Sequence, residues 1–181
     1  MEVVPRGALA LGLRMHLHIR DAGVADRSAV RAVTMRAYGE YATTMQPSAW
    51  AALLGAVESA LISEGRAHRI VVERDGAIVG SVMLFPPAAD AYSGATTRGA
   101  HPELRLLAVD PLARGHGVAR LLVEECVRRA RADGAEAIGL HTSSSMRDAI
   151  RLYAGMGFVR DPARDFQPDG AEVVEGYLRR L

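Results

Sequence analysis

The chain has 181 residues, 49% of them hydrophobic and 24% charged, with a formal net charge of +1 at pH 7. This length and balance suit one globular domain with a real core, and the near-zero net charge gives no electrostatic case for nucleic acid or an anionic membrane. Cys126 is the single cysteine, which excludes an intrachain disulfide and a zinc site built from several cysteines. No apolar run is long enough to cross a bilayer.

The N-terminal residues differ from the remainder of the chain. Residues 1–15 contain the apolar run 7–13, but Arg14 interrupts this run and no basic segment precedes it. We therefore expect a flexible leader rather than a signal peptide, and Met15 is an alternative start of the protein. Residues 16–181 show no repeat, low-complexity tract or linker, which predicts one domain of a cytoplasmic protein.

The first half of the chain predicts two helices and three strands. Apolar residues recur with the helical period in two segments and form short strand-like runs in the others. Asp26 (or Ala25) lies near the start of the first helix, and Ser48 is a plausible cap of the second. A tight turn at 74–76 joins the last two strands as a hairpin. The predicted order is strand 17–20, helix 26–38, helix 48–63, strand 69–73 and strand 78–85.

The second half begins with a long connection, residues 86–102, which by its length is either functional or disordered. A buried strand is predicted at 104–109, because this short apolar run ends at Asp110-Pro111. An amphipathic helix follows, and Cys126 lies on its apolar side, as expected of a buried structural thiol. The remaining predicted elements are strand 135–141, helix 146–155, strand 157–160, a polar loop at 161–170 and strand 173–178.

A glycine-rich loop joins the central strand to its helix. It consists of Arg114, Gly115, His116, Gly117, Val118 and Ala119. At a helix start, such a loop exposes backbone N–H groups and the positive end of the helix dipole, which predicts a phosphate site. The P-loop pattern is absent, and so is the dinucleotide pattern G-x-G-x-x-G, because Arg120 stands where its third glycine would.

Two motifs give the chain a resemblance to a known family. Arg114, Gly117 and Ala119 fill the fixed positions of Q/R-x-x-G-x-G/A, the signature of the GNAT superfamily of N-acetyltransferases. Residues 149–158 resemble the family's A-x-x-x-Y-x-x-x-G-F segment. The order of the predicted elements is also similar to that of the family. The resemblance implies a GNAT-like α/β (α+β) fold, with a mixed, mostly antiparallel sheet of about seven strands flanked by about four helices.

The resemblance also implies a site for acetyl-CoA. In the family, the pyrophosphate lies on the loop formed here by Arg114, Gly115, His116, Gly117, Val118 and Ala119. The pantetheine arm pairs with the preceding strand like an added strand, which assigns backbone contacts to Leu107, Ala108 and Val109. The alternative is a helix start that binds anions only adventitiously.

Glu103 is the candidate general base. Attack on a thioester needs a neutral amine, so a base must take a proton, directly or through water. Glu103 stands where many members of the family keep a glutamate for this role. The alternative is an exposed residue at a strand start, and His101 and His141 are competing bases. His141, at the end of the next strand, is more often a structural histidine with satisfied hydrogen bonds.

Tyr153 is the candidate general acid for the departing CoA thiolate. It occupies the position that has this role in many family members, and a phenol with a pKa of about 10 suits a thiol leaving group. The alternative is a tyrosine whose ring packs in the core. Family members often carry an asparagine seven residues earlier, where this chain has Met146. Ser143, Ser144 and Ser145 are candidate replacements for its hydrogen bond to CoA.

The acceptor site has a broader prediction. The first helices and the long connection contribute Tyr38, Tyr41, Met45, Trp50, Asp90, Tyr92 and Arg98. Aromatic residues with one acid suit an amine with an apolar body, either a small molecule or a peptide amine. The same residues can instead pack the two helices together, which is the expected role of Trp50.

The sequence therefore predicts an acyl-CoA-dependent N-acyltransferase that uses acetyl-CoA and works by direct attack in a ternary complex. A buried Cys126 argues against a cysteine acyl-enzyme. The alternative is a non-catalytic CoA-binding module that acts as a sensor or interaction domain, and a nucleotide-binding α/β domain is weaker still. We expect no metal site, no nucleic acid and no membrane as partner, and a homodimer is compatible with the sequence.

Overall fold

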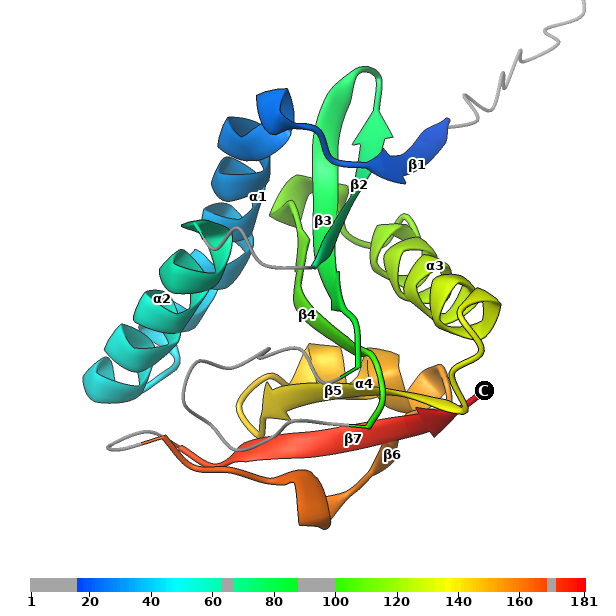
Figure 1. Cartoon of the computed structure of the whole chain (residues 1–181). Coiled ribbons are helices and arrows are strands. Elements are labelled where there is room, and N and C mark those ends of the chain that lie inside the picture. Colours follow the sequence, from blue (N-terminus) through cyan, green and yellow to red (C-terminus); the bar gives the residue numbers. More distant parts are fainter. Residues whose placement is uncertain (1–15, 63–66, 88–99, 169–171) are drawn as a thin grey trace, which may run out of the picture.

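The structure of the protein, a computed structural model, describes residues 16–62, 67–87, 100–168 and 172–181 (Figure 1). Its strands are β1 (Leu17–Asp21), β2 (His68–Arg74), β3 (Ala77–Phe85), β4 (Glu103–Val109), β5 (Ala137–Ser143), β6 (Val159–Arg160) and β7 (Val174–Arg180). They form one seven-stranded sheet in the order β1-β2-β3-β4-β5-β7-β6. Neighbouring strands are antiparallel except for β4 and β5, which are parallel. The predicted mixed, mostly antiparallel sheet is confirmed.

Four α-helices accompany the sheet within the described residues: α1 (Arg27–Gly39), α2 (Pro47–Ile62), α3 (Val118–Ala132) and α4 (Arg147–Gly155). Short 3-10 turns are η1 (Val24–Asp26), η2 (Glu40–Thr43), η3 (Pro111–Ala113) and η4 (Pro162–Arg164). The prediction of Ser48 as a helix cap is wrong, because α2 already begins at Pro47. A proline suits the first helical position, where an N–H would have no intrahelical partner.

Helices α1 and α3 cover opposite faces of the sheet, as two successive residues of β3 show. Gly80 faces α3, and a Cβ added there would lie 2.6 Å from Val118. Ser81 faces α1, where its hydroxyl lies 3.4 Å from that of Thr34. Successive strand residues point to opposite faces, so the sheet is the middle layer, and α2 lies beside α1 (Figure 1).

The main core fills the space between the sheet and the α3 face. Helix α3 contributes a continuous buried stripe, formed by Val118, Leu122, Val123, Cys126, Val127 and Ala130. The stripe has the 3.6-residue period of an amphipathic helix. The predicted buried thiol is confirmed, and burial raises the pKa of Cys126 to about 12. At neutral pH this thiol is protonated and inert as a nucleophile.

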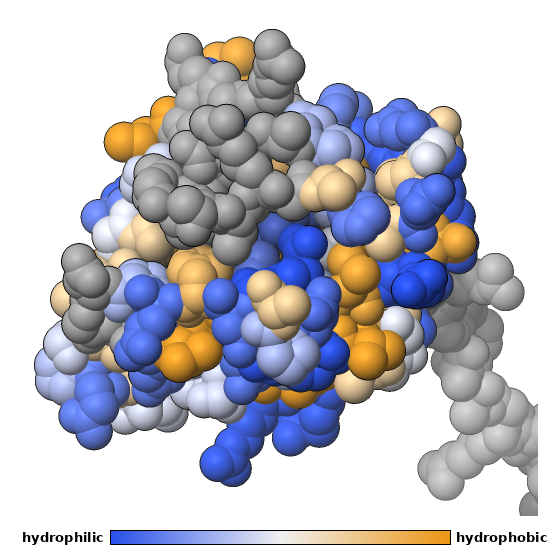
Figure 2. All heavy atoms as spheres, turned by 60° about the horizontal axis from the view of Figure 1, so that its bottom comes forward, coloured by the Kyte–Doolittle hydropathy of each residue, from blue (hydrophilic) through white to orange (hydrophobic). Residues whose placement is uncertain are grey.

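The outer surface is mixed in character. On the face that Figure 2 brings forward, apolar residues lie in small groups separated by hydrophilic ones. Within the described ranges, no helix combines the length and apolar character that crossing a membrane requires. The same ranges contain no cluster of three His, Cys, Asp or Glu side chains arranged for a metal ion.

Candidate active site

Strand β4 is irregular in its middle. Its register with β3 shifts between Ser81 and Met83, and Leu106, at the shift, has a φ of 50°. This left-handed conformation is unfavourable for leucine, so the surrounding sheet must hold it. On its other side, β4 pairs with β5 only at Glu103 and Leu104. Beyond that point the two strands diverge (Figure 1).

The divergence leaves a strand edge that the described part of β5 does not cover. The predicted pantetheine contacts Leu107, Ala108 and Val109 all lie on this segment. Ala108 packs against α1, and Val109 belongs to the main core. Because these two side chains pack in the core, the segment can contact a ligand through its backbone N–H and C=O groups. An extended ligand can pair with such a strand edge.

The exit of β4 is fixed by Asp110. Its carboxylate accepts a hydrogen bond from the Leu112 backbone N–H at 3.0 Å and from Arg36 of α1 at 2.6 Å. Burial opposes ionisation of this carboxyl, but the two donors outweigh it and hold the pKa of Asp110 below its usual value. The ionised aspartate thus ties the turn before the glycine-rich loop to α1.

The glycine-rich loop opens directly onto α3. Gly115 and Gly117 have φ values of 77° and 81°, which favour glycine, and α3 begins at the next residue, Val118. Residues 114–117 are exposed. The first N–H groups of α3 have no intrahelical partner, so the loop presents donors and the positive end of the dipole to solvent. This is the arrangement of an anion site.

Arg114 is held at this loop by a weak contact. It pairs with Glu40 of η2 at 2.5 Å, and both side chains are about half exposed. An exposed pair of this kind contributes at most about 1 kcal/mol. Arg114 can therefore exchange this partner for an anionic ligand. The His116 ring lies beside the same turn, with Nδ1 3.3 Å from the Ala113 carbonyl oxygen.

Tyr153 lies in α4 on the core side of the structure. It is 6% exposed, and its ring meets that of Phe158 edge to face at 5.8 Å. Burial raises the pKa of Tyr153 well above its usual value, and the nearby Tyr38 and Tyr41 add to this effect. The phenol therefore keeps its proton throughout the ordinary pH range. Ring packing, the predicted alternative, is observed, and it leaves the hydroxyl as a possible donor.

Glu103 is buried and bonded rather than exposed. Its carboxylate lies 2.8 Å from Nδ1 of His141 and accepts a hydrogen bond from Arg164 at 3.2 Å. His141 is fully buried, its Nε2–H donates to the Arg164 carbonyl oxygen at 2.8 Å, and its ring meets Phe166 edge to face. The expected alternative of an exposed Glu103 is wrong, and the expectation of a satisfied His141 is confirmed.

Met146 and the three serines predicted as CoA contacts differ in their surroundings. Met146 is buried, and its sulfur accepts a hydrogen bond from the Thr142 hydroxyl. The hydroxyl oxygens of Ser143 and Ser145 lie 2.8 Å apart. Ser144 is the exposed member of the three serines.

Among the predicted acceptor residues, Tyr38 and Tyr41 form an edge-to-face pair at 6.2 Å, and both are close enough to Tyr153 to raise its pKa. Met45 and Trp50 are half-buried. The remaining three, Asp90, Tyr92 and Arg98, lie outside the described residues.

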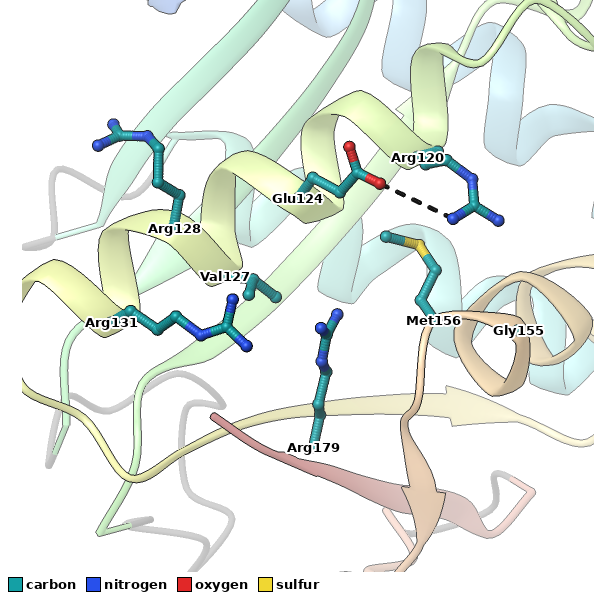
Figure 3. A pocket seen from close by; sticks show the side chains of 8 residues that line it. All are labelled: Arg120, Glu124, Val127, Arg128, Arg131, Gly155, Met156 and Arg179. Carbon is teal, nitrogen blue, oxygen red and sulfur yellow. Dashed lines mark ion pairs between the residues drawn. The ribbon is translucent and has the colours of Figure 1, made fainter.

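A separate groove of about 470 Å³ lies between α3, the end of α4 and β7 (Figure 3). Val127 and Met156 give it apolar character, and Arg131 and Arg179 reach into it from α3 and β7. Its lining residues are Arg120, Glu124, Val127, Arg128, Arg131, Gly155, Met156 and Arg179. The groove holds positive charge and contains none of the predicted base or acid residues.

Arg164 and Arg36 are not among the residues that the sequence predicted for the site. Arg164 contacts Glu103 across 61 residues, and Arg36 contacts Asp110 across 74. Neither lies in a motif. The one local signal is at Gly139 and Gly176, where a Cβ would clash with Arg164, but glycines in predicted strands do not say which side chain they admit.

The sequence matches a known protein family over most of its length. The model of the acetyltransferase (GNAT) family matches residues 32–158. The chain belongs to the GNAT family. The match includes both motifs noted in the sequence, the glycine-rich loop and the Tyr153 segment.

Three curated relatives carry acetyltransferase names. The mycothiol acetyltransferase of Acidothermus cellulolyticus is 34% identical over 93 residues, covering 49% of this chain and 28% of the relative. N-alpha-acetyltransferase 30 of Saccharomyces cerevisiae is 40% identical over 55 residues, covering 30% and 31%. The IAA acetyltransferase of Azospirillum brasilense is 34% identical over 101 residues, covering 55% and 60%. The chain thus spans between 28% and 60% of the length of these relatives.

Solved structures of GNAT proteins share the fold. The PaiA N-acetyltransferase of Thermoplasma acidophilum, in complex with coenzyme A, has a TM-score of 0.65 at 14% identity, covering 92% of this chain and 100% of that one. A GNAT-family acetyltransferase of Staphylococcus aureus Mu50 has a TM-score of 0.65 at 16% identity, covering 92% and 99%. At such identities the likeness shows the fold alone.

Proposed function

We propose that this GNAT acetyltransferase transfers the acetyl group of acetyl-CoA to an amine, by direct attack in a ternary complex. The observation that carries the proposal is the divergence of β4 from β5 next to the exposed N-terminus of α3. An open strand edge suits the amide-rich pantetheine arm, and the neighbouring helix start suits a pyrophosphate. The family membership supports the same donor.

Each predicted site residue has a proposed role. The loop residues 114–119 bind the pyrophosphate, and the backbone of 107–109 pairs with pantetheine and orients the thioester. Glu103 accepts the proton of the acceptor ammonium, and Tyr153 donates one to the departing thiolate. This division suits the surroundings of the two groups, because Tyr153 is buried and protonated whereas Glu103 faces a guanidinium that favours its ionised form.

The acceptor is proposed only as a class. The relatives' names refer to mycothiol, to N-alpha positions and to IAA, so they favour no single acceptor. Tyr38 and Tyr41 near Tyr153 suit an amine with an apolar body, either a small molecule or a peptide amine. A cytoplasmic location and a homodimer are retained as predictions.

Thermal unfolding with increasing acetyl-CoA tests the donor first. A ligand at about 100 times its dissociation constant stabilises the folded state by about 2.7 kcal/mol, so the melting temperature should rise with dose. Release of free CoA thiol on addition of amines then tests transfer. Stabilisation without thiol release from any amine would favour the non-catalytic CoA-binding module. No stabilisation of a folded protein would overturn the donor assignment.

A further inference from the structure

We propose that the proton acceptor is not Glu103 alone but a Glu103–His141 pair that shares one proton, with Arg164 as its positioning residue. The inference rests on the proposed function and names the base of that reaction more closely. Glu103 begins β4 and His141 lies in β5, next to the last paired residues before the strands diverge. Arg164 arrives from η4, which is distant in sequence.

The three side chains form a buried unit. The exposed fractions of the Glu103, His141 and Arg164 side chains are 5%, 0% and 15%. Buried ionisable groups are stable only when they are paired and hydrogen-bonded. Glu103 Oε1 lies 2.8 Å from His141 Nδ1, and Oε2 lies 3.2 Å from an Arg164 Nη atom. Both carboxylate oxygens therefore have partners.

The hydrogen bonds fix how many protons the pair holds. His141 Nε2 lies 2.8 Å from the Arg164 carbonyl oxygen, which can only accept, so Nε2 carries a hydrogen. The 2.8 Å contact of Nδ1 with Oε1 then needs one further proton, on either atom. Without that proton, two lone pairs would face each other. The contacts therefore describe the pair with its one shared proton, and the pair becomes a base once it has released that proton to solvent.

The pair exchanges one proton with the acceptor in each turnover. The proton-free pair takes one proton from the acceptor ammonium, and the neutral amine attacks the thioester carbon. The C–S bond breaks as the tetrahedral intermediate collapses. Tyr153 gives its proton to the thiolate, the nitrogen releases its second proton to solvent as the amide forms, and the Tyr153 phenolate takes a proton back from solvent. The pair then returns its proton to solvent, and the cycle closes.

Two glycines, Gly139 and Gly176, leave the space that Arg164 occupies beside Glu103. Its guanidinium lies over Gly139, where a Cβ would stand 2.8 Å from Nη2, and its backbone lies over Gly176, where a Cβ would stand 3.1 Å from the Arg164 carbonyl carbon. Its buried Nε has no hydrogen-bond partner among the described residues. A cation placed this way at an energetic penalty weakens the hold of the adjacent carboxylate on a proton.

Other charged groups surround the pair. Asp165, which follows η4, attracts His141, but it is itself bonded by Arg160 at 2.5 Å and by the Gly176 N–H at 3.0 Å. Arg105, two residues along β4, lies over the Phe85 ring. Arg164 contacts the carboxylate directly, so its charge should dominate changes in proton affinity.

The pH dependence of kcat/KM tests the pair. In Arg164→Met, the acid limb of the profile should move to higher pH than in the unmodified enzyme by about one to two pH units, because a nearby cation is lost. In Arg164→Lys, which keeps a cation, the acid limb should return most of the way to its position in the unmodified enzyme. In His141→Asn, which keeps a donor but cannot titrate, the limb should move to lower pH. The exposed Arg180→Met and His68→Asn should leave it in place.

A spectroscopic measurement separates this inference from the proposed function. The shared proton should give a far-downfield proton NMR signal that is absent in His141→Asn, shifted in Arg164→Met and retained in His68→Asn. Its absence from the unmodified protein would overturn the pair, as would acid limbs that neither variant moves. If the signal is present but no amine is acetylated, the shared proton stands, whereas the proposed function fails and with it the role of the pair as base.

Discussion

Gly80 of β3 lies directly against Val118, the first residue of α3. A Cβ at Gly80 would stand 2.6 Å from Val118 Cγ1 and 3.2 Å from the Ala108 carbonyl oxygen. We expect Gly80→Ala to lower the free energy of unfolding by about 1–3 kcal/mol, since overpacking displaces the helix or the strand. It should also weaken acetyl-CoA binding, because the same helix start carries the loop. Urea unfolding and ligand-dependent melting measure both effects.

Gly55→Ala is the matched control for that substitution. Gly55 lies within α2, and a Cβ there has nothing within 4 Å. Alanine should raise stability by about 0.5–1 kcal/mol through helix propensity and leave acetyl-CoA binding unchanged. A Gly80→Ala protein as stable as the unmodified one would contradict the close packing of β3 on α3.

Gly117 and Gly134 allow the loop to be tested with equal backbone strain. Their φ values are 81° and 76°, and neither has an atom within 4 Å of a built Cβ. Alanine at either position should cost about 1–2 kcal/mol of stability. Gly117→Ala should also raise the KM for acetyl-CoA by about tenfold or more, whereas Gly134→Ala should leave this KM unchanged. Equal effects of the two variants on KM would remove the phosphate role from the loop.

Local patterns predicted the central unit of the fold well. The apolar run at 104–109 and the helical stripe from Val118 to Ala130 each carry their signal within one element, and both were found close to the expected bounds. Strand β7 was expected at 173–178 and spans Val174–Arg180, because strand ends depend on neighbouring strands rather than on local sequence.

The surroundings of Glu103 could not be predicted from the sequence. Its partners His141 and Arg164 lie 38 and 61 residues away, and no spacing rule links them. The positive φ of Leu106 was also hidden, because leucine gives no signal for a left-handed residue. The sequence identified Glu103 as a candidate base, whereas only the tertiary structure shows that its carboxylate is paired with His141 and Arg164.

Glu125 should make the stability of α3 depend on pH. The Arg128 guanidinium, with help from Arg129, outweighs burial and lowers the pKa of Glu125 to about 2. A carboxyl with a lowered folded-state pKa stabilises the fold above its unfolded value of about 4.3, and this contribution is lost as the pH falls towards 2. Glu125→Gln should therefore destabilise the protein by about 1 kcal/mol at pH 7.

Denaturant unfolding of this variant at several pH values provides the check. The difference from the unmodified protein should shrink steadily below about pH 4. Glu124→Gln is the control, because Glu124 is more than half exposed and lies 3.7 Å from Arg120, so its effect should be close to zero. A Glu125→Gln difference that persists undiminished at pH 2 would show that the ion pairs are not its cause.

Tyr153→Phe tests the acid with little change in packing. The ring that meets Phe158 is kept, and only the hydroxyl is lost. We expect kcat to fall by about 10²-fold or more, with the KM for acetyl-CoA and its stabilising effect nearly unchanged. Tyr177→Phe, which removes a hydroxyl that donates to Glu175 at 3.0 Å, should keep full turnover.

The pH profile adds a second criterion for Tyr153. Burial raises the pKa of Tyr153 above its usual value, so loss of its proton should not limit the rate at ordinary alkaline pH. A raised pKa makes the phenol a weaker acid, so the acid role requires the hydroxyl to lie within hydrogen-bond reach of the leaving sulfur. If Tyr153→Phe retains full kcat while Tyr177→Phe does too, Tyr153 serves packing alone and the thiolate takes its proton from water.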